Sequence, residues 1–72
     1  MATYNGHKSR NYWNVSLWLN NDEGFYRYAK RLCSYMTKDA AADRLARELD
    51  GQRTPDGARY SRSAIRAALV GI

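Results

Sequence analysis

With 72 residues, the chain has room for one domain but not for a catalytic domain accompanied by a regulatory one. Twelve lysines and arginines against seven acidic residues give a net charge of +5, which favours acidic partners such as nucleic acid or an acidic protein surface. One cysteine and one histidine exclude an internal disulfide and a zinc site of ordinary ligand spacing.

The N-terminal part of the chain contains one ambiguous element. Residues 1–8 are polar and include the turn signal Tyr4-Asn5-Gly6, so we expect a flexible segment there. Residues 10–19 fit a helix capped by Ser9 or Asn11. Strand-like alternation competes, with apolar side chains at every second position: Trp13, Val15, Leu17 and Leu19. Both alternatives stay open, and we favour the helix.

Two further helices are predicted by apolar stripes at three- and four-residue spacing. The first begins at a capping box formed by Asn20 and Glu23 and runs to about Met36. Its apolar stripe consists of Phe25, Tyr28, Ala29, Leu32, Cys33 and Met36. The next helix restarts at Thr37 or at Lys38-Asp39, and Gly51 ends it as a left-handed residue. Its buried face consists of Ala41, Ala42, Leu45, Ala46 and Leu49.

The C-terminal part is predicted to contain a tight loop and one more helix. Residues 52–60 form the loop, in which Pro55 presets a turn dihedral and Gly57 takes a conformation that other residues avoid. Ser61 caps the last helix, whose inward-facing residues are Ile65, Ala68 and Leu69. We therefore expect residues 1–72 to form a single all-α domain of three to four short helices packed around one aromatic-rich core.

No group of residues in the sequence suggests catalysis. His7 has no neighbouring nucleophile or carboxylate motif, and Cys33 lies on an apolar stripe, where a cysteine behaves as a small hydrophobic residue. Surface ion pairs explain the acidic residues of the third helix, for example Asp43 with Arg47 four residues on. We therefore expect a protein that is not an enzyme and that needs no cofactor and no metal.

Aromatic residues are concentrated between positions 12 and 35. Such rings can stack on unpaired bases when basic residues lie beside them, or they can fill a thin core. Trp13 and Trp18 are five residues apart, so on a helix they point in different directions. We favour core and interface roles over base stacking, with Trp13 and Trp18 as a candidate aromatic interface.

Basic residues with hydroxyl neighbours lie in the C-terminal half. The candidate partner-binding or nucleic-acid-binding residues are Arg53, Arg59, Ser61, Arg62, Ser63 and Arg66. Arg62 and Arg66 share one face of the last helix, where arginines can reach guanine edges in a major groove while hydroxyls contact phosphates. If this helix binds DNA, both arginines should be more than half exposed and point the same way. The plainer alternative, that a basic protein places its arginines on exposed helices, has more weight.

A group of short segments is spread over nearly the whole chain: Tyr4-Asn5-Gly6-His7, Arg10 to Leu19, Asn21-Asp22-Glu23-Gly24, Tyr26-Arg27 and Thr54 to Tyr60. In these segments the chain resembles a family of small uncharacterised bacteriophage and prophage proteins. Members commonly open with Tyr-Asn-Gly, continue with Trp-Asn-Val-x-Leu-Trp and close with a Thr-Pro-Asp-Gly loop before a last helix. This chain departs from that pattern at His7, where many members have Trp, and at Asn11, where many have Glu. The resemblance implies a phage setting and no particular chemistry.

A second resemblance is local to the C-terminal half. Leu45 to Leu49, Thr54-Pro55-x-Gly57 and Tyr60 to Leu69 are similar to the helix-turn-helix of large serine recombinases, whose second helix lies in DNA. The connection here is about two residues shorter, and the catalytic recombinase domain is absent. The resemblance therefore implies DNA contact at most, without recombinase activity.

These observations lead to two alternative functions. The first is a non-enzymatic phage accessory protein that binds a macromolecular partner and inhibits a host enzyme or an antiviral defence system, in the manner of an anti-CRISPR protein. The second is a small basic DNA-binding protein that uses the helix-turn-helix-like C-terminal half. A virion structural part has the least support. We expect the protein to act in the cytoplasm of the infected bacterium, without membrane contact. Homo-oligomers would supplement the thin core of so small a domain.

Overall fold

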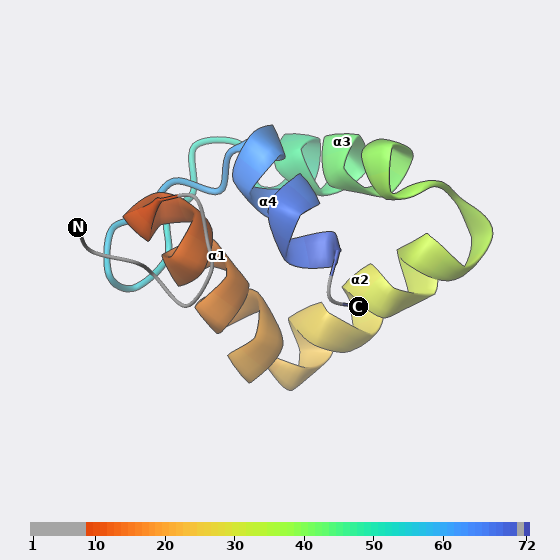
Figure 1. The fold of residues 1–72 in the computed structure, drawn as a ribbon, viewed down its shortest axis with the longest axis horizontal. Helices are drawn as coiled ribbons and strands as arrows, with labels where there is room; N and C mark the ends of the chain where they lie inside the picture. Colours follow the sequence, from red (N-terminus) through yellow and green to blue (C-terminus); the bar gives the residue numbers. More distant parts are fainter. Residues whose placement is uncertain (1–8, 71) are drawn as a thin grey trace.

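The computed structural model describes residues 9–70 and 72. Within this part of the chain lie four helices: α1 (Arg10–Asn21), α2 (Glu23–Tyr35), α3 (Lys38–Glu48) and α4 (Arg62–Leu69) (Figure 1). The predicted all-α fold is therefore confirmed, and residues 10–19 form a helix rather than a strand. The expectations for residues 1–8, including the flexible segment and His7, lie outside the described residues.

Three of the four helices begin at the capping residues that the sequence predicted. Ser9, Thr37 and Ser61 each accept, through the side-chain hydroxyl, a hydrogen bond from a backbone N–H of the first helical turn. For α1 and α3, where the sequence left two alternatives, the first one holds. These caps satisfy amide groups that have no carbonyl partner inside the helix.

The predicted start of α2 was wrong. Its cap is Asp22, whose carboxylate accepts a hydrogen bond from the amide of Phe25 at 3.0 Å, and not Asn20. Asn20 remains in the last turn of α1 and donates to the carbonyl of Ser16. Asp22 alone separates the two helices, and its own N–H bonds to the last turn of α1. A negative charge is favoured at a helix N-terminus, which explains why the aspartate rather than the asparagine takes this position.

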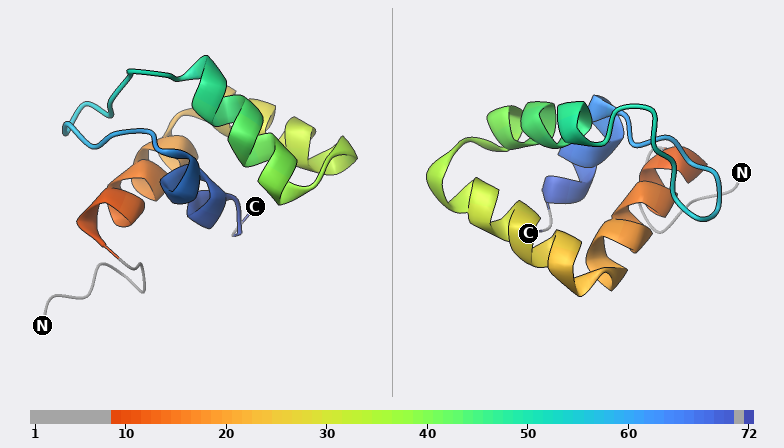
Figure 2. Two further views of the ribbon diagram at one scale, coloured as in Figure 1. Left: turned by 90° about the horizontal axis from the view of Figure 1, so that it is seen from above. Right: turned by 180° about the vertical axis from the view of Figure 1, so that it is seen from behind.

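The last helix lies in the middle of the molecule. Helices α1, α2 and α3 follow one another around an open frame, and α4 fills its centre (Figure 1). In this position α4 packs against both α1 and α3. Helix α2 also contacts α1 and α3. Figure 2 shows the same arrangement from above and from behind. The radius of gyration, 11.3 Å, is that of a compact domain of this length, about 11 Å.

The core is aliphatic, so the prediction of an aromatic-rich core was wrong. Half of the buried apolar residues are alanines, which let helix backbones approach closely and leave no room for rings. The buried apolar residues are Val15, Leu19, Ala29, Leu32, Ala41, Ala42, Leu45, Ala58, Ala64, Ile65, Ala68 and Leu69. Aromatic side chains instead surround this core in half-buried positions, where Phe25 and Tyr60 meet edge to face with ring centroids 5.8 Å apart.

The connection between α3 and α4 is the tight loop expected from the sequence. Gly51 does not end α3 as predicted, because the helix is capped by Leu49 and Gly51 lies two residues further on. Gly51 has a φ of +77° and Gly57 closes the turn with a φ of +91°, both left-handed values that favour glycine. The amide of Gly57 donates to the carbonyl of Thr54 at 2.8 Å, so Pro55 and Asp56 occupy the two central positions of the turn.

Candidate functional site

The two arginines of α4 that suggested DNA contact are held by acidic residues of α3. Arg66 donates from Nε to Asp39 Oδ1 at 2.6 Å, and Arg62 Nε lies 3.7 Å from Asp43 Oδ1. Asp43 also pairs with Arg47 at 2.7 Å, as the four-residue spacing predicted. Both α4 arginines therefore point the same way, toward α3 and not directly away from the protein.

The exposure expected for a DNA-binding helix is met at one position only. The side chain of Arg62 is 52% exposed, but that of Arg66 is 36% exposed, below the half that the hypothesis required. The hydrogen bond and charge of Arg66 lower the pKa of Asp39 from its ordinary value, so the acid stays ionised and keeps its partner. Exposed pairs of this kind contribute little to stability because solvent screens them, but they occupy guanidinium donors.

The α3–α4 pair also differs from a helix-turn-helix in its connection. The general motif joins its helices by a turn of three or four residues, whereas here α3 ends at Glu48 and α4 begins at Arg62. The length of this connection is compatible only with the long connection of the recombinase motif noted above. The second helix is short and central, with four of its residues buried: Ala64, Ile65, Ala68 and Leu69. A helix placed between α1 and α3 presents little of its surface to a groove (Figure 1).

The remaining basic and hydroxyl candidates lie at the loop and at the start of α4. Arg53 and Arg59 face each other across an antiparallel β-bridge, and Arg53 also donates to the carbonyl of Gly57 at 3.1 Å. Ser61 is the cap of α4, and its hydroxyl lies 3.4 Å from that of Ser63. The hydroxyl of Ser61 therefore already accepts a hydrogen bond within the protein, whereas the side chains of Arg53 and Arg59 are exposed.

A buried polar contact fixes the loop against α1. Asn14 is 1% exposed and Thr54 is 4% exposed, although both side chains are polar. The Thr54 hydroxyl donates to Asn14 Oδ1 and accepts from the amide of Ala58 at 3.0 Å, while Asn14 Nδ2 donates to Asp56 Oδ2 at 2.9 Å. Among the described residues, no buried side-chain nitrogen or oxygen lacks a partner. Because buried polar groups need such partners, this contact specifies where the loop docks.

The two tryptophans belong to α1 and are both half-buried. Trp18 donates from Nε1 to Asp56 Oδ2 at 2.9 Å, so this ring supports the loop. These two donors, Asn14 and then Trp18, lower the pKa of Asp56 from its ordinary value. Asn14 and Trp18 belong to the Trp-Asn-Val-x-Leu-Trp segment, and their partners Thr54 and Asp56 belong to the Thr-Pro-Asp-Gly segment. Two of the segments that carry the family resemblance are therefore the two sides of one structural contact.

A second surface combines aromatic and basic residues of two helices, and we call it the α2–α3 face. It consists of Tyr28, Arg31 and Tyr35 from α2, Met36 at the turn, and Arg44, Arg47 and Glu48 from α3. The Tyr28 hydroxyl donates to Glu48 Oε1 at 2.8 Å, and Arg44 pairs with Glu48 at 3.4 Å. The neighbouring Tyr28 hydroxyl and then Glu48 raise the pKa of Arg44, which keeps its charge.

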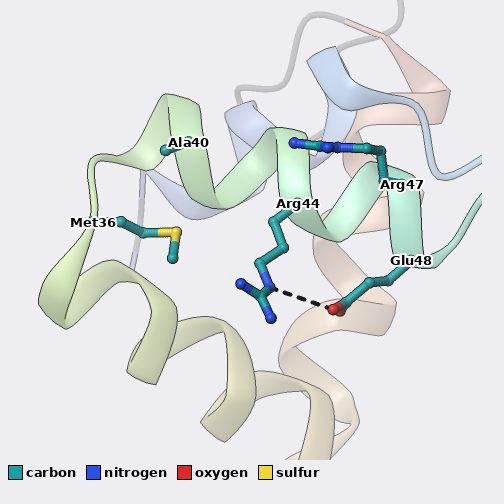
Figure 3. Close-up of a pocket in the computed structure, with 5 residues that line it drawn as sticks. All are labelled: Met36, Ala40, Arg44, Arg47 and Glu48. Carbon is teal, nitrogen blue, oxygen red and sulfur yellow. Dashed lines mark ion pairs between the residues drawn. The ribbon is translucent and has the colours of Figure 1, made fainter.

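A shallow hollow of about 420 Å³ lies on the α3 side of the α2–α3 face, and its lining residues are Met36, Ala40, Arg44, Arg47 and Glu48. Figure 3 shows the Arg44 side chain reaching from α3 toward α2, with Met36 beside the turn that joins the two helices. Tyr35 is 63% exposed, and Arg31 is exposed without an ion-pair partner among the described residues. The sequence analysis did not single out Arg31, although the spacing of Tyr28, Arg31 and Tyr35 places them along one side of α2.

The described residues hold few groups for other chemistry. They contain no cluster of three histidine, cysteine or acidic side chains that would hold a metal ion. Cys33 is a free, half-buried thiol on α2. No helix within residues 9–70 combines the length and hydropathy required to cross a bilayer.

Comparison with known proteins gives a family but no activity. Residues 1–71 match the model of one protein family, and that family is described as one of unknown function. No curated protein and no solved structure gives a significant match.

Proposed function

The chain belongs to DUF7249, a family of unknown function, and we propose that it is a non-enzymatic phage accessory protein that binds and inhibits a host enzyme or an antiviral defence protein. In this proposal it acts in the cytoplasm of the infected bacterium and uses the α2–α3 face to bind an acidic surface of its partner. The phage setting rests on the resemblance of the Arg10 to Leu19 and Thr54 to Tyr60 segments to phage proteins.

The observation that carries the proposal is the composition of the α2–α3 face. Tyrosine and arginine are enriched among the residues that dominate binding energy at protein interfaces. Here Tyr35 is the large aromatic side chain that is most exposed in the described chain, and Arg31 beside it has its donors free. Arg44 and Arg47 are paired with Glu48 and Asp43. The net positive charge of the face is therefore that of Arg31, which is complementary to a carboxylate.

DNA binding through α4 is the second candidate function, and the contacts of α4 give it less support. Arg66 and Arg62 would have to leave Asp39 and Asp43 before they could reach base edges. Such binding would be recognised by a mobility shift of duplex DNA that weakens steeply with salt. Absence of any shift at about 50 mM salt, where non-specific attachment is strong, would exclude this candidate.

The test of the main proposal is capture of a partner from a bacterial lysate by the tagged chain. We expect one stoichiometric host protein to be retained by the wild type and lost with the double variant Arg31→Gln/Tyr35→Ala. Neither side chain has a partner within the described protein, so the variant should keep the wild-type melting temperature. Arg59→Gln, which removes the same charge from the loop, is the matched control and should retain the partner.

The captured protein must then lose activity when the purified chain is added. Equal capture by the wild type and the α2–α3 face variant would contradict the proposed surface. Capture without any inhibition would contradict the proposed inhibitory role.

A further inference from the structure

The loop presents two arginines side by side in a fixed geometry. Arg53 and Arg59 are opposite residues of an antiparallel bridge. The flanking bonds run from the amide of Thr54 to the carbonyl of Ala58, and from the amide of Tyr60 to the carbonyl of Gln52, at 2.8 and 3.4 Å. This pattern makes the arginines a non-hydrogen-bonded pair, the kind in which Cα atoms are about 4.5 Å apart and side chains are closest.

A pair of like charges at such a position is unfavourable for folding by itself. Directly opposed like charges destabilise an antiparallel pair. In the described chain no carboxylate forms an ion pair with either guanidinium, whereas the four arginines of α3 and α4 all have such a partner. The nearest acids in sequence are Asp50 and Asp56. Asp56 Oδ2 already accepts from Asn14 and Trp18.

The scaffold beneath the two arginines is held rigidly. Asn11 on α1 bonds to Arg59 twice, accepting from its amide at 3.1 Å and donating to its carbonyl at 3.2 Å. Arg53 donates from Nη1 to the carbonyl of Gly57, which leaves its other N–H groups available. The backbone of both residues and the side chain of Arg53 are therefore preorganised, so that the ordering of the Arg59 side chain is the main conformational cost when an anion binds.

We infer that Arg53 and Arg59 form a binding site for a phosphate group, free or in a nucleic-acid backbone. Two guanidinium groups at this spacing match the several oxygens of one phosphate. The exposed neighbours are Gln52, Pro55, Asp56 and Gly57, which offer no large apolar contact of the kind that a protein interface core uses. Of these, Asp56 is negatively charged, and its Oδ2 accepts hydrogen bonds from α1. A phosphate needs only charge and donors, and backbone phosphates are bound without reading sequence. This site is separate from the α2–α3 face and does not depend on the proposed function.

The test is a titration of the isotopically labelled full chain followed by NMR, with inorganic phosphate in one arm and a short DNA duplex in the other. We expect saturable shifts at the amides of the loop and about tenfold weaker binding for Arg59→Gln, which loses the charged hydrogen bonds of one guanidinium. The bonds between Arg59 and Asn11 use the Arg59 backbone, so this variant should stay folded and melt no lower than the wild type. Arg31→Gln removes the same charge from the α2–α3 face and should bind phosphate as the wild type does.

The two arms distinguish the source of the phosphate. Tighter binding of the duplex, with a salt slope that falls by about 0.9 in Arg59→Gln, identifies a backbone phosphate. Binding of inorganic phosphate alone identifies a free anion. Acetate at matched ionic strength is the specificity control, and equal shifts with acetate would overturn the inference. Equal phosphate affinity of the wild type and Arg59→Gln would overturn it as well.

Discussion

The buried contact between α1 and the loop should be the most sensitive polar interaction in the described protein. In the variant Asn14→Ala the hydroxyl of Thr54 loses its acceptor at a site that is 4% exposed. A buried donor without a partner costs about 1–3 kcal/mol, against a total stability of about 4–11 kcal/mol for a domain of this length. The melting temperature should therefore fall by roughly 5–20 °C.

Chemical denaturation followed by tryptophan fluorescence measures this effect, because Trp18 bonds to the same loop. Asn20→Ala is the matched control on the same helix. Asn20 is exposed and bonds only within α1, so the free energy of unfolding should change by no more than about 0.5 kcal/mol. A double-mutant cycle with Thr54→Val should give a coupling energy of about 1 kcal/mol or more. An Asn14→Ala cost below about 0.5 kcal/mol, or strictly additive variants, would refute the role assigned to this contact.

Three further outcomes follow from the core, the turn and the ion pairs. Leu32→Ala removes a fully buried side chain and should cost about 2–5 kcal/mol in denaturant melts, and an unchanged midpoint would show that α2 is wrongly phased. Gly57→Ala places a side chain at a φ of +91° and should destabilise by about 1 kcal/mol or more, whereas Gly24→Ala within α2 should be neutral or stabilising. Asp39 and Asp56 have folded-state pKa values below their ordinary 3.8, so their stabilisation is complete above that pH and is lost as the pH falls through the lower values. Melting temperatures measured from about pH 5 downwards should therefore fall less steeply in Asp39→Asn/Asp56→Asn than in the wild type, and parallel curves would contradict this explanation.

Features of the fold that depend on near neighbours could be predicted from the sequence. The caps at Ser9, Thr37 and Ser61 and the turn ended by Gly57 involve partners within four residues. Ser61 and the turn were predicted correctly, and Ser9 and Thr37 were each one of two predicted alternatives. The start of α2 was missed because Asn20 and Asp22 are both good caps, and the charge of Asp22 decided between them.

Features that depend on the packing of distant helices could not be predicted in the same way. The aromatic-rich core was expected from composition, but the alanines at the helix contacts leave the rings at its edge. Whether Arg66 would be free depended on how α4 crosses α3, because its partner Asp39 is 27 positions away. The polar pairing of Asn14 with Thr54 spans 40 positions and leaves no local pattern. The α2–α3 face could have been predicted in part, because the spacing of its α2 residues can be recognised in the sequence.

The central position of α4 has a consequence for the order of folding. The contacts of α1 with α2 and of α2 with α3 are local, and they can form early. The core, however, takes four of its twelve buried apolar residues from α4, which contacts α1 only after two intervening helices have been placed. Bringing α4 to α1 closes a long loop of chain, which loses conformational entropy before any apolar surface is buried. Docking of α4 is therefore the expected rate-limiting step, and the first three helices alone should form a collapsed state without fixed side-chain packing.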